Sequence, residues 1–237
     1  MFFLTRKCTV SDSGLLSGFV DRHSHLLPGA DDGVQTMEES LQILSLYEQL
    51  GISEVWLTPH IMEDMPNRTE DLKERFAELK AAYQRTVTLH LASENMLDNL
   101  FEKRLERNDL LPLGEDDTHL LVETSYFNPP IGLNNILLRI KSKGYVPVLA
   151  HPERYAYMEE DDYHRLKEMN VMFQLNLPSF AGAYGTSVQK KARLLLGKGL
   201  YDLCGMDIHS KAFLEVFLQS KLSHSEISKI ENILNRK

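Results

Sequence analysis

The chain has 237 residues, of which 43% are hydrophobic and 25% are charged, and its formal net charge at pH 7 is −8. This length and apolar fraction are enough for one large core, so we expect a single domain over residues 1–237, with an N-terminal extension at 1–17 and C-terminal helices within 210–237. The acidic balance argues against a nucleic-acid partner, because phosphate contacts require clustered lysines and arginines.

The cysteine count and the N-terminal segment bear on the compartment. Cys8 and Cys204 lie far apart, which favours neither a disulfide framework nor a cysteine-based zinc site. Residues 1–16 lack the apolar stretch and cleavage site of a signal peptide, and no run approaches the ~18 apolar residues that span a bilayer. We therefore expect a cytoplasmic protein without membrane insertion, whose oligomeric state the sequence leaves open.

Short apolar runs alternate with helical patterns along the chain. Thr36 and Glu39 form a capping box that starts a helix, and Gly51 is placed to end it; Asn67 and Glu70 repeat this pattern for the next helix. The predicted strands are 18–23, 54–58, 87–92, 119–124, 146–150, 172–176 and 201–205, and further helices are predicted at 131–143, 159–169, 186–198 and 224–235, with a weaker pattern at 96–107.

Alternating strands and helices predict an α/β fold in which parallel strands are joined by right-handed crossovers. Two architectures fit this pattern, a TIM-like barrel and an open doubly wound sheet. Neither G-x-G-x-x-G nor G-x-x-x-x-G-K-[ST] follows a predicted strand, so the nucleotide-binding forms of the open sheet lose support. Periodicity alone leaves the closure of the sheet open.

Residues that can bind metal follow the C-terminal ends of six predicted strands. They are His23, His25 and Asp32 after the first strand, His60 after the second, Glu94 after the third, Glu123 at the end of the fourth, His151 and Glu153 after the fifth, and Asp207 and His209 after the seventh. In a parallel barrel these ends lie on the face that carries the chemistry. We therefore expect the side chains to converge on one metal site.

Imidazoles mixed with carboxylates suit Mn, Fe or Zn, and such a site can activate water and hold phosphate oxygens. Arg154 lies beside the fifth-strand group and is the candidate phosphate-binding residue, with a loop ion pair to Glu153 or Asp161 as the alternative. The sequence contains neither a Cys-x5-Arg loop at Cys204 nor a G-x-S-x-G elbow, so a covalent nucleophile is not expected.

The segments "DRHSHLLPGADDG", "LTPH", "ASE", "LLVET", "AHPERY" and "GMDIH" together resemble the PHP (polymerase and histidinol phosphatase) superfamily. The resemblance runs from about Asp21 to His209 and is strongest to the bacterial tyrosine-protein phosphatase branch of capsular and exopolysaccharide synthesis. It implies a distorted seven-stranded (β/α)7 TIM-like barrel, the PHP fold. It also implies three divalent metal ions, usually Mn²⁺, with Fe, Zn or Mg as alternatives.

The resemblance also implies how the ligands are divided among the ions. His23, His25 and Asp207 would hold one ion, Glu94 would bridge to a second held by Glu123 and His151, and Asp32, His60 and His209 would hold a third. Arg154 would bind phosphate, and a metal-bound water would be the nucleophile. Asp21 and Asp31 would support the ligands.

The function implied is hydrolysis of phosphotyrosine by a metal-bound hydroxide, with a bacterial tyrosine autokinase as the partner protein. The alternative is a metal-dependent phosphoesterase that acts on a small metabolite, as a histidinol phosphatase does. One departure concerns the substrate: a second arginine often follows the last histidine in the family, but residues 210–221 contain none. Lys211 is the candidate to replace it.

Overall fold

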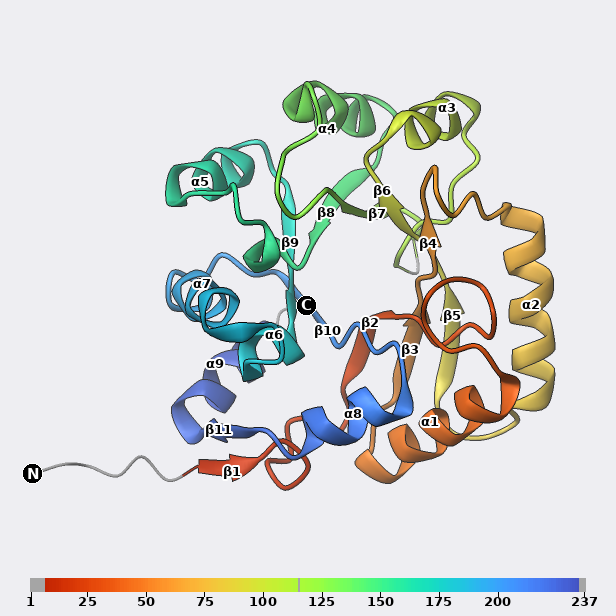
Figure 1. Cartoon of the computed structure of the whole chain (residues 1–237), viewed down its shortest axis with the longest axis vertical. Helices are drawn as coiled ribbons and strands as arrows, with labels where there is room; N and C mark the ends of the chain where they lie inside the picture. Colours follow the sequence, from red (N-terminus) through yellow and green to blue (C-terminus); the bar gives the residue numbers. More distant parts are fainter. Residues whose placement is uncertain (1–6, 115, 235–237) are drawn as a thin grey trace, which may run out of the picture.

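The computed structural model describes residues 7–114 and 116–234. Parallel strands curl around the centre of the molecule, and the helices lie outside them (Figure 1). One sheet has the strand order β2 (Val20–Ser24), β3 (Glu54–Leu57), β5 (Thr88–Leu91). The other has the order β10 (Leu203–Gly205), β9 (Met172–Asn176), β8 (Val146–Ala150), β7 (His119–Glu123), β6 (Glu94–Met96), β4 (His60–Ile61).

Each predicted strand overlaps a strand of the structure, whereas β4, β6 and the terminal strands β1 (Lys7–Thr9) and β11 (Lys221–Ser223) were not predicted. Pro59 separates β3 from β4, and because proline has no N–H to donate to a ladder, the chain leaves one sheet and resumes in the other. A parallel bridge between Ser24 and Ile208 brings β2 next to the end of β10. The predicted α/β class with a curled parallel sheet is confirmed, while closure as one seven-stranded barrel stays a prediction.

Nine α-helices lie in the described part of the chain. They are α1 (Met37–Leu50), α2 (Thr69–Ala82), α3 (Asn99–Arg107), α4 (Leu133–Ser142), α5 (Glu160–Glu168), α6 (Leu177–Ala181), α7 (Gly185–Gly197), α8 (Lys211–Leu218) and α9 (His224–Leu234). The helices predicted at 131–143, 159–169, 186–198 and 224–235 are present, although residue 235 lies outside the described residues. The short α6 and the 3-10 turn η1 (Pro152–Arg154) were not predicted.

The two predicted helix starts differ in outcome. The Thr36 hydroxyl accepts from Glu39 N at 3.2 Å, and Gly51 ends α1 with φ 77°, as predicted. The other half of the predicted capping box differs, because the Glu39 carboxylate accepts from Lys211 N at 3.0 Å. The cap predicted at Asn67 is wrong, because α2 begins at Thr69. The Asn67 amide instead donates to the backbone oxygens of Ala30 and His60, each at 2.8 Å, and so joins the loop at Ala30 to the start of β4, near the predicted site.

The two ends of the described chain meet in a small antiparallel sheet. β1 (Lys7–Thr9) pairs with β11 (Lys221–Ser223), so the predicted N-terminal extension is joined to the C-terminal helices that flank β11. Within residues 7–114 and 116–234, each helix is too short or too polar to cross a membrane.

Candidate metal centre

A β-bulge in β2 directs the first histidine pair. Asp21 is in register with Val55 and Ser24 with Leu57, so β2 contains one more residue than β3 between the same two rungs. A bulge of this kind changes the face of the sheet toward which the following side chains point. The carboxylate of Asp21 is buried and accepts from Tyr47 Oη and Met206 N, each at 2.8 Å, and from His23 N at 3.3 Å, while its supporting role stays a prediction.

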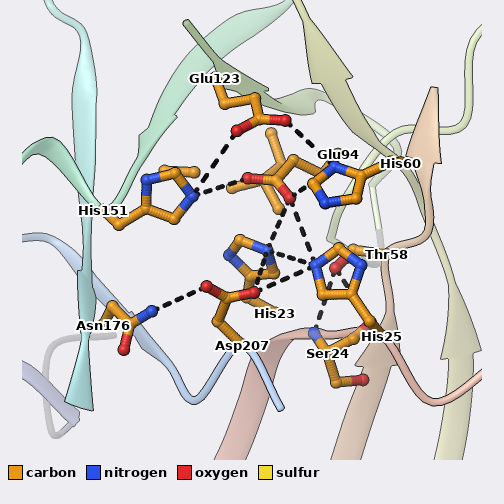
Figure 2. Close-up of polar contacts among 12 residues, drawn as sticks. His23, Ser24, His25, Thr58, His60, Glu94, Glu123, His151, Asn176 and Asp207 are labelled. Atoms are coloured by element: carbon orange, nitrogen blue, oxygen red, sulfur yellow. Dashed lines mark hydrogen bonds and ion pairs between the residues drawn. The ribbon is translucent and has the colours of Figure 1, made fainter. Parts of the chain in front are cut away.

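The structure brings together the metal ligands that the family resemblance implies, at the C-terminal ends of the strands, whereas the carboxylate of Glu153 contacts Tyr201 and Asn176 instead. Figure 2 shows buried members of this group, among them Glu94 at its centre. We call these residues the metal cluster: His23, His25, Asp32, His60, Glu94, Glu123, His151, Asp207 and His209. Most of these side chains are buried. Those of Asp32 and His209 are 62% and 29% exposed and mark the side that opens to solvent.

Four side chains of the cluster surround one potential cation position. Nε2 of His23 lies 3.0 Å from Glu94 Oε2 and 3.3 Å from Asp207 Oδ1. Nε2 of His25 lies 3.3 Å and 3.1 Å from the same two oxygens. The two imidazole nitrogens are themselves 3.1 Å apart, which is favourable only where a proton or a cation lies between their lone pairs.

A second potential position lies on the other side of Glu94. His60 Nδ1 is 3.2 Å from Glu94 Oε2 and 3.1 Å from Glu123 Oε1, and His151 Nε2 is 2.9 Å from Glu94 Oε1. Within the described chain, the contact between His60 Nδ1 and Glu123 Oε1 lacks the geometry of a hydrogen bond, and neither buried atom has another hydrogen-bond partner. A cation between this imidazole nitrogen and this carboxylate oxygen would accept a lone pair from each and would satisfy both atoms.

The third position lies at the solvent side of the cluster. Asp32 Oδ1 is 3.6 Å from His60 Nε2 and 3.6 Å from His209 Nε2, so the three residues assigned to this ion by family resemblance do meet. The structure adds two features to that assignment. His25 belongs to the same group and stacks on His209 with 4.0 Å between ring centroids. His60 faces two positions, because its other nitrogen points to Glu94 and Glu123.

Two side chains outside the cluster orient its histidines. Gln174 Oε1 lies 3.1 Å from His23 Nδ1, and Asp31 Oδ2 lies 2.7 Å from His25 Nδ1, so Nε2 of each ring is directed inward. Such partners fix ring orientation and strengthen metal binding. Asp31 also accepts from the backbone of His60 and Gly33, as expected of a supporting residue. The sequence analysis did not predict a role for Gln174, although a polar residue inside the apolar run "MFQLN" could have indicated one.

Two members of the cluster have a left-handed backbone that side chains disfavour. His151 has φ 34° and Asp207 has φ 53°. Each such residue costs on the order of 1 kcal/mol or more, and such conformations gather at functional sites. Hydrogen bonds hold both: His151 N donates to Gln174, and Asp207 N donates to the His23 carbonyl at 2.7 Å.

The buried charges of the cluster require compensation. Burial lowers the pKa of His23, but Glu94 and Asp207 outweigh it and raise that pKa to about 9. Burial and the Glu94 charge raise the pKa of Glu123. Burial and the Arg154 charge lower the pKa of His151 to about 4, which keeps that ring neutral as metal binding requires. Protons on the histidines or divalent cations can therefore balance these carboxylates, and the mixed nitrogen and oxygen donors fit Mn, Fe or Zn.

Arg154 lies beside the cluster and not in a loop ion pair. Its Nη1 donates to Asp207 Oδ2 at 2.7 Å, and its Nη2 donates to Tyr126 Oη at 2.6 Å. The alternative pairing with Glu153 is wrong, because Glu153 is buried and accepts from Tyr201 Oη and Asn176 N. Arg154 therefore contacts the metal cluster through Asp207, and its role in phosphate binding stays a prediction.

Other residues singled out in the sequence lie outside the cluster. The Lys211 ammonium donates to Gln42 Oε1 at 3.1 Å and lies 3.9 Å from Glu215, on the surface between α1 and α8. Burial raises the pKa of the Cys204 thiol, which fits a core residue and not a nucleophile.

Comparison with known proteins agrees with this architecture. The family model described as capsular polysaccharide synthesis, CpsB/CapC, matches residues 19–218. Tyrosine-protein phosphatase YwqE of Bacillus subtilis (strain 168) is 27% identical over 198 residues, which cover 81% of this chain and 77% of YwqE. Tyrosine-protein phosphatase CpsB of Streptococcus pneumoniae is 28% identical over 208 residues, which cover 81% of this chain and 83% of CpsB.

The fold also matches that of a solved structure. The work on YwqE from Bacillus subtilis and CpsB from Streptococcus pneumoniae, described there as unique metal-dependent tyrosine phosphatases, includes a chain that superimposes on this one with a TM-score of 0.76. The match has 23% sequence identity and covers 92% of this chain and 89% of the other. The chain belongs to the CpsB/CapC family of capsular polysaccharide synthesis.

Proposed function

We propose that this chain is a metal-dependent protein-tyrosine phosphatase. The observation that carries the proposal is the buried cluster of histidines and carboxylates, which opens to solvent at Asp32 and His209 and has Arg154 at its side. The names of YwqE and CpsB support this reading over a phosphatase for small metabolites.

We propose three divalent ions, with Mn²⁺ first and Fe, Zn or Mg as alternatives. His23, His25 and Asp207 would hold one ion, and Glu94 would join it to a second ion held by Glu123, His151 and His60. Asp32, His209 and His60 would hold the third. Support comes from the three groups of donor atoms described above, which share Glu94, His25 and His60.

When bound, the ions would supply a nucleophile from water at neutral pH and neutralise charge on the phosphoryl group. The protein's own contribution is to position these parts. Arg154 would bind two phosphate oxygens through its guanidinium, which Asp207 and Tyr126 already hold in place. Asn176 donates to Asp207 Oδ2 at 2.9 Å, so Oδ1 of the same carboxylate remains directed at His23 and His25.

The partner would be a phosphotyrosine protein in the cytoplasm, with a tyrosine autokinase of capsule synthesis as the first candidate. The family description supports the link to capsule synthesis. We also propose that residues 1–237 form a single domain, a distorted seven-stranded barrel. The Ser24–Ile208 bridge and the β1–β11 pairing, which joins the two ends of the described chain, support this arrangement.

The test is a substrate panel on the Mn²⁺-loaded protein, which compares a phosphotyrosine peptide with histidinol phosphate and phosphoserine peptide. We expect hydrolysis of the phosphotyrosine peptide with the highest kcat/KM. His151→Ala should lose metal and activity, whereas His164→Ala should retain both, since His164 is 48% exposed on α5. A preference for histidinol phosphate would establish the small-metabolite alternative instead.

A further inference from the structure

The guanidinium of Arg154 is flanked by two tyrosine rings that come from distant parts of the chain. Its Cζ lies 4.6 Å from the ring centroid of Tyr126 and 4.2 Å from that of Tyr184. Tyr126 follows β7 by three residues, and Tyr184 immediately precedes α7. The two rings therefore reach the same guanidinium from separate segments of the chain.

Each of the two rings also packs against a further aromatic side chain. Tyr126 stacks on Tyr155, with centroids 6.2 Å apart and an interplanar angle of 27°. Tyr184 contacts Phe213 of α8, with centroids 6.0 Å apart. Tyr155 is fully buried, whereas Tyr126 and Tyr184 are only half-buried. The two flanking rings are therefore held in place while part of each remains accessible.

This arrangement restricts how a phosphate ester can reach Arg154. The rings cover part of the guanidinium surface, so a phosphoryl group would approach along the edge that carries the N–H groups. In an aryl phosphate the aromatic ring begins one oxygen atom away from phosphorus. A ring anchored in this way has to lie close to Tyr126 or Tyr184, where aromatic contacts are favourable.

We infer that Tyr126 and Tyr184 are specificity-determining residues that contact the aromatic ring of the substrate and favour aryl over alkyl phosphates. The inference rests on the proposed phosphatase function. It adds that these two rings select phosphotyrosine, because ions held by the metal cluster would act on the phosphoryl group, which all phosphate monoesters share.

The test uses two competitive inhibitors that are not hydrolysed, phenylphosphonate and methylphosphonate, with the full-length Mn²⁺-loaded protein. The ratio of their inhibition constants isolates the contribution of the aromatic ring, because both carry the same phosphonate group. We expect the unsubstituted protein to bind phenylphosphonate more tightly, and Tyr126→Leu and Tyr184→Leu each to reduce that preference by about 2- to 10-fold.

Two further variants separate recognition from positioning. Tyr126→Phe removes the hydroxyl that accepts from Arg154 but keeps the ring, so it should weaken both inhibitors and preserve their ratio. Phe127→Leu changes a neighbouring ring that is 75% exposed, and its ratio should match that of the unsubstituted protein. A ratio that stays unchanged in both leucine variants, while both inhibitors bind more weakly, would show that the tyrosines only position Arg154.

Failure of this inference is distinguishable from failure of the proposed function. If the Mn²⁺-loaded protein hydrolyses phosphotyrosine peptides but the leucine variants keep the inhibitor ratio, only the role of the two tyrosines is refuted. If the unsubstituted protein hydrolyses no phosphotyrosine peptide, the proposed function itself fails. A loss of the ratio in Phe127→Leu equal to that in Tyr126→Leu would also contradict the assignment.

Discussion

Arg154 donates from Nη1 to Oδ2 of Asp207 at 2.7 Å, while Oδ1 of the same carboxylate lies 3.1 Å from His25 Nε2. One carboxylate therefore links the candidate phosphate-binding residue to the candidate metal site. The relationship explains how the side chain of Arg154 can be fixed before substrate arrives, and it raises the question of whether Arg154 also supports metal binding.

Replacement of Arg154 should impair catalysis more than metal binding. In Arg154→Ala the Asp207 carboxylate keeps its hydrogen bond from Asn176, so we expect metal content close to that of the unsubstituted protein. Without the Arg154 guanidinium, the phosphoryl group loses a positive charge that is already in position, and kcat should fall by about 100- to 1000-fold. Metal analysis and kinetics on the same preparation check this. Metal loss as large as that in His151→Ala would show that Arg154 is needed to hold Asp207.

The two adjacent aspartates should differ in their effect on metal binding. Asp31→Ala removes the partner of His25 Nδ1, and losses of this kind weaken metal affinity by about 10- to 100-fold. Asp32→Ala removes a candidate ligand at the solvent side and should affect mainly the ion that we propose between Asp32 and His209. Competition titrations with a chromogenic chelator measure both. Full retention of affinity in Asp31→Ala would contradict a supporting role for this residue.

Metal binding should become stronger as pH rises. Without bound ions, burial lowers the pKa of His23 but Glu94 and Asp207 raise it from 6.5 to about 9. Because the folded-state pKa of His23 is raised, the attraction between protonated His23 and the carboxylates of Glu94 and Asp207 stabilises the metal-free protein. This stabilisation is fully present below pH 6.5 and is lost as the pH rises through 9. A metal ion must displace that proton. The increase in Tm produced by Mn²⁺ should therefore grow between pH 6.5 and 9, and calorimetry that found the reverse trend would refute this coupling.

Gly33 should tolerate no side chain. A Cβ there would lie 2.3 Å from the carbonyl oxygen of His25, so Gly33→Ala must displace the loop that carries Asp31 and Asp32. We expect a loss of about 1–3 kcal/mol in the free energy of unfolding, measured by urea denaturation. Gly197→Ala is the control, because a Cβ at Gly197 meets no atom within 4 Å. Equal stability of the two variants would contradict the close approach.

The sequence predicted which residues would converge because a parallel sheet places the C-terminal ends of its strands on one face. Histidines and carboxylates at or just beyond the ends of β2, β3, β5, β7, β8 and β10 meet for this reason, although they are far apart in the chain. Their role as metal ligands stays a prediction. The double contact of His60 could not be predicted, because strand order alone does not set the orientation of an imidazole ring.

Other features had no usable signal in the sequence. The bulge in β2 depends on its register with β3, which a single sequence does not specify. Asn67 has the residue type of a helix cap, but contacts with Ala30 and His60 determine its conformation instead. Tyr126 and Tyr184 lie in separate loops, and only the tertiary structure places both beside Arg154.

The most direct test of the proposed function is the turnover of a phosphotyrosine peptide as a function of bound Mn²⁺ per chain, starting from chelator-treated protein. Because the donor groups share Glu94, His25 and His60, we predict negligible turnover without metal and an increase that is complete near three ions per chain. Full turnover in the thoroughly chelated protein would contradict the account.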